Sequence, residues 1–196
     1  MAESFIAEAR REQIINACID TLEEVGYVKV SLTKIARKAK ISTGLISYHF
    51  SDKADLINHT LIYLLSNQLD YISERVVGKN TATEQLQAFI EASIIYQETY
   101  YKNNIALIEI IFNAQTSDET PYYRITDEEE EDHLYMLLKD ILLEGKNKQE
   151  FTQVFNADAV ATIIQGAISE SMLKDLSKVD YNYSHELIKM LMSMIK

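Results

Sequence analysis

The scarcity of glycine and proline is the feature of this sequence that most restricts its fold. The chain has five glycines and one proline in 196 residues, whereas these two residue types usually make up about 12% of a protein. Tight turns and hairpins depend on them. No alternating strand pattern is found, and apolar residues recur at helical spacing along the chain. The sequence therefore predicts an all-α protein of about nine helices.

Capping residues and glycines mark the ends of these predicted helices. Ser31 and Ser42 are N-cap candidates, and capping boxes start at Thr81 (with Glu84) and at Thr126 (with Glu129). Gly26, Gly78 and Gly145 are candidate helix stops. We expect helices over residues 4–25, 32–38, 43–50, 52–77, 83–101, 105–112, 126–145, 157–178 and 184–196, with a loop over 113–125 around Pro121.

Composition limits the compartment and the cofactors. The single cysteine, Cys18, excludes a disulfide framework and a multi-cysteine metal site. No apolar run reaches the roughly 18 residues that span a membrane, and the first residues do not resemble a signal peptide. We therefore expect a cytoplasmic protein, and no metal or cofactor is predicted.

The net charge of −11 is distributed unevenly. Residues 1–60 hold eight basic and eight acidic residues, so the whole acidic excess lies in residues 61–196. Between Lys29 and Lys53 there are six basic residues and one acid. A cationic cluster on an acidic body is typical of a small module that binds a polyanion. An ordinary solvated face is the alternative interpretation.

The segment from Ser31 to Leu56 carries the most information about function. Its sequence, SLTKIARKAKISTGLISYHFSDKADL, predicts two short capped helices separated by a tight turn near residues 39–42. In this helix-turn-helix geometry the second helix inserts its N-terminal half into the major groove of DNA. Lys53 lies in the first turn of the following helix, where its ammonium and the backbone N–H groups can meet one phosphate. We expect outward-facing side chains at Thr43, Gly44, Ser47 and Tyr48. A plain helical hairpin is the alternative.

The order of residues in this segment resembles the DNA-binding domain of the TetR/AcrR family over residues 9–58. The likeness rests on SLTKIA from Ser31, ISTGLISYHF from Ile41, and KADL from Lys53, preceded by a first helix that ends at Gly26-Tyr27. The resemblance implies a homodimeric, ligand-responsive transcriptional regulator, usually a repressor, that binds a palindromic operator. It also implies a DNA-binding domain over residues 1–50 and a ligand-binding and dimerisation domain over residues 51–196, with a connecting helix over 51–78.

The resemblance also implies roles for individual residues. Thr43, Leu45 and Ser47 would face bases, and Ser31, Tyr48, His49 and Lys53 would face phosphates, although His49 could instead cap or pack. Lys40 stands where the family usually has a left-handed glycine, which costs about 1 kcal/mol and is offset by a phosphate contact. Ser47 stands where the family often has tyrosine, which weakens the role assigned to that position.

Two apolar stripes near the C-terminus are broad enough to face both a core and a second subunit. In the family that this chain resembles, the last two helices form a four-helix dimer interface. The expected interface residues are Val160, Ile164, Ala167, Ser171, Leu187, Leu191 and Ile195. The alternative is that both stripes belong only to this chain's own core.

Aromatic and polar residues at helical spacing predict an effector pocket. Phe89, Ser93, Tyr96 and Tyr100 share one helix face, and Phe112 is expected to close the pocket. Glu109 is the only charge between Ile105 and Phe112, and a buried carboxylate there would favour a cationic effector. The effector class stays open between lipophilic and cationic, and packing or a gap to solvent is the alternative for each residue.

Other functions have less support in the sequence. The acidic run 127–132 could bind a hard cation, but acids at a helix N-terminus are the better interpretation. No P-loop, GxGxxG, HExxH or GxSxG motif is present, and the four histidines lie in separate contexts. A DNA-binding protein of the same fold without an effector, and a helical enzyme without recognisable motifs, are the two alternative functions.

Overall fold

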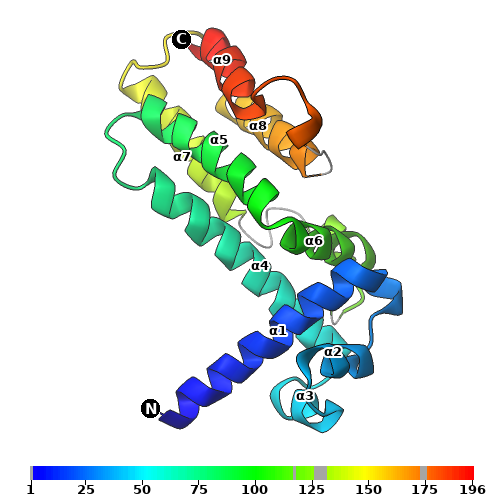
Figure 1. Cartoon of the computed structure of the whole chain (residues 1–196). Coiled ribbons are helices and arrows are strands. Elements are labelled where there is room, and N and C mark those ends of the chain that lie inside the picture. Colours follow the sequence, from blue (N-terminus) through cyan, green and yellow to red (C-terminus); the bar gives the residue numbers. More distant parts are fainter. Residues whose placement is uncertain (1, 117, 126–131, 173–175) are drawn as a thin grey trace. The chain divides into compact units, whose positions relative to one another are not determined.

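The computed structural model describes residues 2–116, 118–125, 132–172 and 176–196. Within these ranges the chain forms nine α-helices and two 3-10 turns, with one isolated bridge between Gln115 and Pro121 and no strand (Figure 1). The predicted all-α fold is thereby confirmed. The α-helices are α1 (Ala2–Lys29), α2 (Leu32–Ala39), α3 (Thr43–His49), α4 (Lys53–Val76), α5 (Ala82–Thr99), α6 (Tyr101–Asn113), α7 (His133–Asn147), α8 (Ala157–Ser171) and α9 (Tyr183–Ile195).

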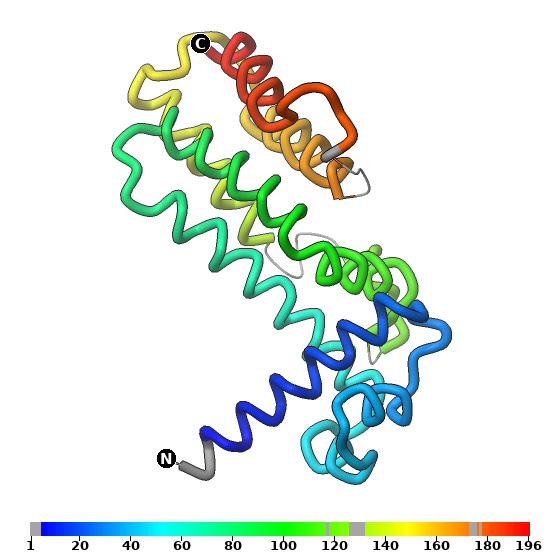
Figure 2. The backbone as a smooth tube through the Cα atoms, viewed as in Figure 1, coloured from blue at the N-terminus to red at the C-terminus, as the bar shows by residue number. Residues whose placement is uncertain are grey.

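The chain packs as two compact units. The first comprises the described residues of Met1–Ser66 and Lys102–Glu130, and the second those of Asn67–Tyr101 and Glu131–Lys196. Figure 2 traces the chain through α1, α2 and α3 into the long helix α4, which contributes residues to both units. The predicted boundary between residues 50 and 51 separates a DNA-binding domain from a ligand-binding domain. It divides the chain by function and not by packing, and it stays a prediction. In the described part of the chain, no helix has the length and apolar character needed to cross a bilayer.

The core of the first unit follows from helical periodicity. Ile14, Cys18 and Leu22 recur every four residues on one face of α1, and all three are fully buried. They share the interior with buried side chains of α2, α3 and α4, including Ile35, Ile46 and Leu56. This packing holds the short helices α2 and α3, which are too short to be stable by themselves.

Gly26 breaks α1 near its C-terminus. Its backbone adopts φ 72° and ψ 166°, a conformation that is essentially restricted to glycine, and a helical turn then continues to Lys29. The predicted stop at Gly26 is therefore confirmed as a break. The predicted stop at Gly78 is also confirmed, since α4 ends at Val76 and Gly78 has φ 88°.

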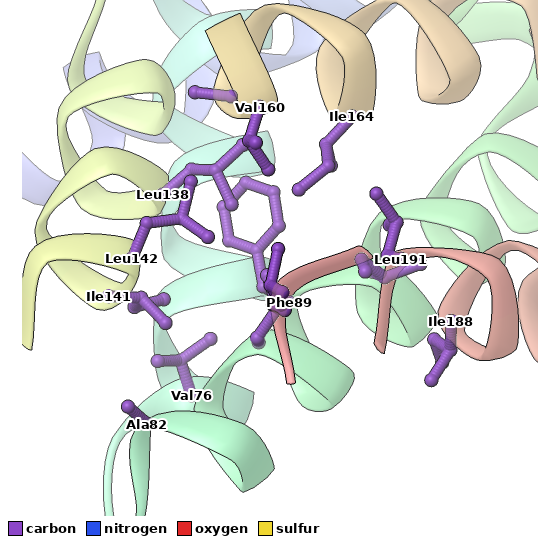
Figure 3. Close-up of a cluster of buried hydrophobic side chains, with 14 of the residues drawn as sticks. Val76, Ala82, Phe89, Leu138, Ile141, Leu142, Val160, Ile164, Ile188 and Leu191 are labelled. Carbon is purple, nitrogen blue, oxygen red and sulfur yellow. The ribbon is translucent and has the colours of Figure 1, made fainter. Parts of the chain in front are cut away.

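The core of the second unit lies between α5, α7, α8 and α9 (Figure 3). Phe89 of α5 is buried among apolar side chains from the other three helices. The capping box predicted at Thr81 and Glu84 is present at the start of α5. The labelled members of this cluster in Figure 3 are Val76, Ala82, Phe89, Leu138, Ile141, Leu142, Val160, Ile164, Ile188 and Leu191.

Gly145 does not end a helix, contrary to the sequence-based prediction. It is buried inside α7, which continues to Asn147. A Cβ atom built on Gly145 would lie 2.2 Å from the ring of Phe151. This glycine is therefore required for close packing of an aromatic ring against the helix, and not for a turn. The capping box predicted at Thr126 and Glu129 and the acidic run 127–131 lie outside the described residues; Asp132 caps α7.

Three other predicted helix bounds were wrong. α5 ends at Thr99 because Tyr100 leaves helical geometry, with φ −110° and ψ 44°. α6 begins at Tyr101 and is longer than the predicted 105–112, and its apolar residue Phe112 is 65% exposed. α8 ends at Ser171, whose hydroxyl donates to the carbonyl of Ile168 over 2.6 Å and so competes with helix propagation.

Candidate nucleic-acid interface

The turn between α2 and α3 is built from two serine caps and one left-handed residue. The hydroxyl of Ser31 accepts from the N–H of Lys34 (3.4 Å), and that of Ser42 accepts from the N–H of Leu45 (3.2 Å). Lys40 adopts φ 57° and ψ 43°, and its N–H donates to the carbonyl of Arg37 (3.2 Å). The left-handed conformation inferred for Lys40 is thus present in a non-glycine residue.

The exposed face of α3 coincides with the residues predicted to read DNA. Thr43, Gly44, Ser47 and Tyr48 are exposed, and Tyr48 is 81% exposed. A Cβ atom on Gly44 would meet only the hydroxyl oxygen of Ser42, at 3.9 Å. Packing inside the unit therefore does not require a glycine at this position, and the lack of a side chain affects only the outer surface of α3. On the opposite face, Ile46 and the C-cap residue Phe50 are buried.

Two of the predicted contact residues are less accessible. Leu45 and His49 are both half-buried. The His49 ring lies edge-on to Tyr48, with ring centroids 5.0 Å apart. The structure therefore brings all the predicted residues of α3 together, and it gives His49 a packing role as well.

The basic residues near this face are in different environments. Lys34 donates to the carbonyl of Lys29 (2.7 Å), and Lys38 forms an ion pair with Glu24. Arg37 and Lys40 are exposed. Ser31 is half-buried and is engaged by its cap bond to Lys34. The cationic cluster predicted from the sequence is therefore partly neutralised within the chain.

Lys53 begins α4, as predicted, but its ammonium is held by the protein. Its Nζ lies 4.3 Å from the centroid of the Tyr27 ring and donates to the Tyr27 carbonyl over 3.3 Å. Removal from water by this half-buried position lowers the pKa of Lys53, because burial disfavours the charged form. Burial likewise raises the pKa of Tyr27.

Two side chains of α1 that the sequence did not single out hold the ends of α2 and α3. The guanidinium of Arg11 donates to the His49 carbonyl (2.7 Å), and the amide of Gln13 donates to the Ala39 carbonyl (2.9 Å). Both acceptors lie at helix C-termini, where carbonyl groups lack partners within the helix. These bonds join residues 38 and 26 positions apart, so no local sequence signal could have identified them.

The predicted pocket residues are divided between the two units. Phe89, Ser93 and Tyr96 are buried in α5, and the Ser93 hydroxyl donates to the carbonyl of Phe89 (2.7 Å) within its own helix. Glu109 and Phe112 lie in the first unit. Two surface grooves near the end of α4 and the start of α5, both lined by Gly78, Lys79, Ala88 and Glu91, include none of the six predicted residues.

Three tyrosines of the second unit form one aromatic cluster. The ring of Tyr71, a residue that the sequence pattern did not indicate, lies 5.3 Å from that of Tyr96 and 5.7 Å from that of Tyr100. The Tyr96 and Tyr100 rings are 4.7 Å apart, and the guanidinium carbon of Arg75 lies 3.3 Å from the centroid of Tyr71. These rings pack on one another in the structure.

Glu109 is half-buried, and its carboxylate is already engaged. It accepts a hydrogen bond from the backbone N–H of Tyr27 over 2.8 Å. The side-chain amide of Asn113 lies 3.4 Å from the same oxygen, Oε2. This geometry therefore gives no support to the prediction that Glu109 is a buried carboxylate available to a cationic ligand.

The predicted dimer residues face mostly inward. Val160, Ile164, Leu191 and Ile195 belong to the core of their own unit, and Ser171 is buried. Ala167 and Leu187 are half-buried. The alternative interpretation, an intramolecular core, describes the first four residues. The large apolar side chains that are exposed on α8 and α9 are Ile163, Met190 and Met194, and Met190 is 62% exposed.

Comparisons with known proteins agree with this geometry. Residues 14–60 match the family profile described as bacterial regulatory proteins, tetR family. The chain is 30% identical over 118 residues to the HTH-type transcriptional regulator BetI of Escherichia coli O17:K52:H18 (strain UMN026 / ExPEC), an alignment that covers 59% of this chain and 60% of BetI. The chain thus matches less than two thirds of the length of this curated relative.

Solved structures resemble the fold over nearly the whole chain. The transcriptional regulator FadR of Bacillus subtilis, in complex with stearoyl-CoA, superposes with a TM-score of 0.76 at 22% identity, covering 94% of this chain and 99% of FadR. AibR, in complex with isovaleryl coenzyme A and operator DNA, superposes with a TM-score of 0.73 at 14% identity, covering 95% and 97%. At these identities the likeness concerns the fold alone. With its helix-turn-helix and its all-α fold, the chain is similar over residues 14–60 to the tetR family of bacterial regulatory proteins.

Proposed function

We propose that this chain is a transcriptional regulator that binds a palindromic DNA operator as a homodimer, acts as a repressor and is released by a small molecule. The observation that carries the proposal is the outer face of α3. There Thr43, Gly44, Ser47 and Tyr48 stand exposed on a helix whose N-terminus is capped by Ser42 and whose C-terminus is bonded to Arg11 of α1. A rigidly held helix with short exposed side chains suits insertion into the major groove.

The proposal divides the contacts between bases and phosphates. Thr43, Gly44, Leu45 and Ser47 lie at or near the N-terminal half of α3, the part that reaches base edges in this motif. Ser31, Lys40, Tyr48, His49 and Lys53 would contact the phosphates, which set affinity and register without reading sequence. Such a regulator acts in the bacterial cytoplasm, where its operator is found, and not as an enzyme.

A palindromic operator requires two reading helices related by a two-fold axis, so the chain must pair with a second copy. We propose that the outer faces of α8 and α9 form this contact, through Ile163, Met190 and Met194 and the half-buried Leu187. The buried residues Val160, Ile164, Leu191 and Ile195 would support the interface from within, because they hold the two helices against α5.

The effector that we propose is lipophilic and not cationic. Glu109, the residue that favoured a cation, is engaged by the Tyr27 N–H. The pocket would lie along the α5 face that bears Phe89, Ser93, Tyr96 and Tyr100, where the tyrosine cluster could separate to admit an apolar chain. FadR and AibR, which share this fold, are described in complexes with acyl-coenzyme A molecules. Long-chain and branched short-chain acyl-coenzyme A are therefore the first effectors to test.

Selection from a random duplex library tests DNA binding without knowledge of the operator. The purified full-length chain is expected to enrich a palindromic sequence, and Thr43→Ala is expected to change the preferred bases at one position of each half-site. Enrichment of no sequence by the wild-type chain would reject the proposed function. A chain that binds the selected duplex but is not displaced by any acyl-coenzyme A would support the alternative of a DNA-binding protein without this effector.

Light scattering on the same chain tests the proposed dimer surface. The double variant Met190→Glu, Met194→Glu is expected to be monomeric, because two charges would be buried in the interface. Met136→Glu, on the exposed side of α7, is the matched control and is expected to stay dimeric. A dimer that survives the double variant would place the interface elsewhere.

A further inference from the structure

The geometry around Gly26 points to a role for Glu109 in DNA binding. Glu109 lies on α6, far in sequence from the helix-turn-helix segment but within the same compact unit. Its Oε2 accepts the N–H of Tyr27 over 2.8 Å, directly after the break in α1. Because the break removes Tyr27 from regular helix geometry, this N–H takes a side-chain acceptor in place of a helix carbonyl.

The glycine at the break makes the contact possible. A Cβ atom on Gly26 would lie 3.2 Å from Oε2 of Glu109, tighter than nine in ten contacts of real Cβ atoms, so the carboxylate would have to shift. Gly26 also has φ 72°, which other residues rarely adopt. Two independent requirements, backbone conformation and space for a carboxylate, therefore meet at one residue. This coincidence indicates that the Glu109 contact is a specific feature of the site.

Tyr27 in turn holds Lys53 by two contacts. The ammonium lies 4.3 Å from the ring centroid of Tyr27, a cation–π geometry, and it donates to the carbonyl of the same residue over 3.3 Å. An ammonium has three N–H groups. One is used by this carbonyl, which leaves two that can bond a phosphate, and Lys53 as a residue is half-buried and not fully enclosed.

We propose that Glu109 and Tyr27 are positioning residues that fix the ammonium of Lys53 where it can meet a DNA phosphate. Glu109 holds the backbone of Tyr27, and Tyr27 holds Lys53. The inference rests on the proposed DNA-binding function and adds to it a residue outside the helix-turn-helix segment. It also means that any change that withdraws α6 from α1 removes the support of Lys53.

Whether replacing Glu109 strengthens or weakens DNA binding distinguishes a positioning role from a purely electrostatic one. Removing an acid from a protein that binds a polyanion should strengthen binding if the acid acts only through its charge. Positioning predicts the opposite: Glu109→Ala weakens binding to the selected duplex roughly three- to tenfold. Glu109→Gln keeps an oxygen acceptor for the Tyr27 N–H and is expected to bind at least as well as wild type. Glu23→Ala, which removes one acid from α1, is the matched charge control.

A double-variant cycle on duplex DNA of random sequence completes the test, since phosphate contacts do not depend on sequence. Lys53→Ala is expected to reduce the log–log salt slope by about one unit. Adding Glu109→Ala to Lys53→Ala is expected to cause no further loss, because both changes remove the same contact. Tyr27→Leu, which keeps the backbone N–H, is expected to weaken binding as Lys53→Ala does. Circular dichroism confirms that each variant is folded.

A spectroscopic measurement keeps the inference testable without DNA. In the wild-type chain the ring current of Tyr27 should shift the ε-proton resonances of Lys53 upfield, and this shift should be lost in Glu109→Ala and retained in Glu109→Gln. Binding in Glu109→Ala as tight as wild type, or losses that add in the double variant, would overturn the inference and leave the proposed function intact. Failure of the wild-type chain to bind any duplex would reject the proposed function instead, while the resonance shift would still report the Glu109–Tyr27–Lys53 contacts.

Discussion

The guanidinium of Arg11 lies against the C-terminal end of α3 and donates to the carbonyl oxygen of His49 over 2.7 Å. It also stacks over the ring of Phe50, 4.5 Å from the ring centroid. A cation at a helix C-terminus interacts favourably with the helix dipole and satisfies a carbonyl that the helix itself leaves unpaired. Arg11 therefore fixes the end of the helix that we propose reads DNA.

Replacing Arg11 is expected to destabilise the first unit. Arg11→Ala should lower the free energy of unfolding by about 1–2 kcal/mol, because it removes a charge-assisted hydrogen bond to a partly buried carbonyl. Urea denaturation followed by circular dichroism measures the change. Arg10→Ala, which removes an exposed contact to Gln13 on the same helix, should change stability by less than about 0.5 kcal/mol. Equal losses in the two variants would contradict the capping role.

Lys40 is expected to favour DNA binding at a cost in stability. Because its φ is 57°, Lys40→Gly should raise the free energy of unfolding by roughly 0.5–1 kcal/mol. The same change should weaken duplex binding and reduce the salt slope by about one unit, because one phosphate contact is lost. Gln149→Gly, at φ 58° in the second unit, should give the same stabilisation and leave DNA binding unchanged. A Lys40→Gly variant that binds DNA as wild type would remove Lys40 from the interface.

Gly145 and Gly166 offer a matched pair of helical glycines. Gly145→Ala should destabilise the second unit by about 1–3 kcal/mol, since the new Cβ would lie 2.2 Å from the Phe151 ring. Gly166→Ala, where a Cβ would meet no atom within 4 Å, should instead stabilise the chain by about 0.5–1 kcal/mol through better helix propensity. Thermal denaturation of both variants measures the difference. Changes of the same sign would show that the space beside Phe151 is not limiting.

Glu150 makes stability depend on acid pH. Its carboxylate accepts from the N–H groups of Thr83 (2.9 Å) and Ala82 (3.1 Å) at the start of α5. The backbone hydrogen bond from Thr83 is the main cause that lowers the pKa of Glu150 in the folded state. Its stabilising contribution is therefore present above the unfolded-state pKa, about 4.3, and is lost as the pH falls through the lower folded-state pKa.

Glu150→Gln is accordingly expected to lower stability at pH 7 and to flatten the decrease in stability between neutral and acid pH. Denaturant titrations at several pH values, from neutral down to pH 3, measure both effects. Glu98→Gln, an exposed acid at the other end of α5, is the control and should keep the wild-type pH dependence. An unchanged pH profile in Glu150→Gln would contradict the role of this carboxylate.

The sequence by itself determined the features that depend on neighbouring residues. The serine caps correctly predicted the starts of α2 and α3, and the capping box at Thr81 predicted the start of α5. An N-cap can be recognised locally because it bonds N–H groups only two or three residues away. Gly26 and Gly78 marked breaks because a positive φ is a local property. Helical periodicity identified the buried faces of α1 and α3, and with them the outward direction of Thr43 and Ser47.

Only the tertiary structure decided which residues meet across the fold. The bonds from Arg11 to His49 and from Glu109 to Tyr27 join residues 38 and 82 positions apart. A periodic pattern shows that a helix face is buried, but it does not identify the partner. For this reason the stripe with Val160 and Leu191 could face a core, a second subunit or both, and the structure assigns these two residues to the core of their unit. Likewise, Gly145 suggested a helix stop, but it accommodates the ring of Phe151. Local chemistry fixes helix ends over a few residues, whereas contacts are fixed by the packing of side chains that only the folded chain brings together.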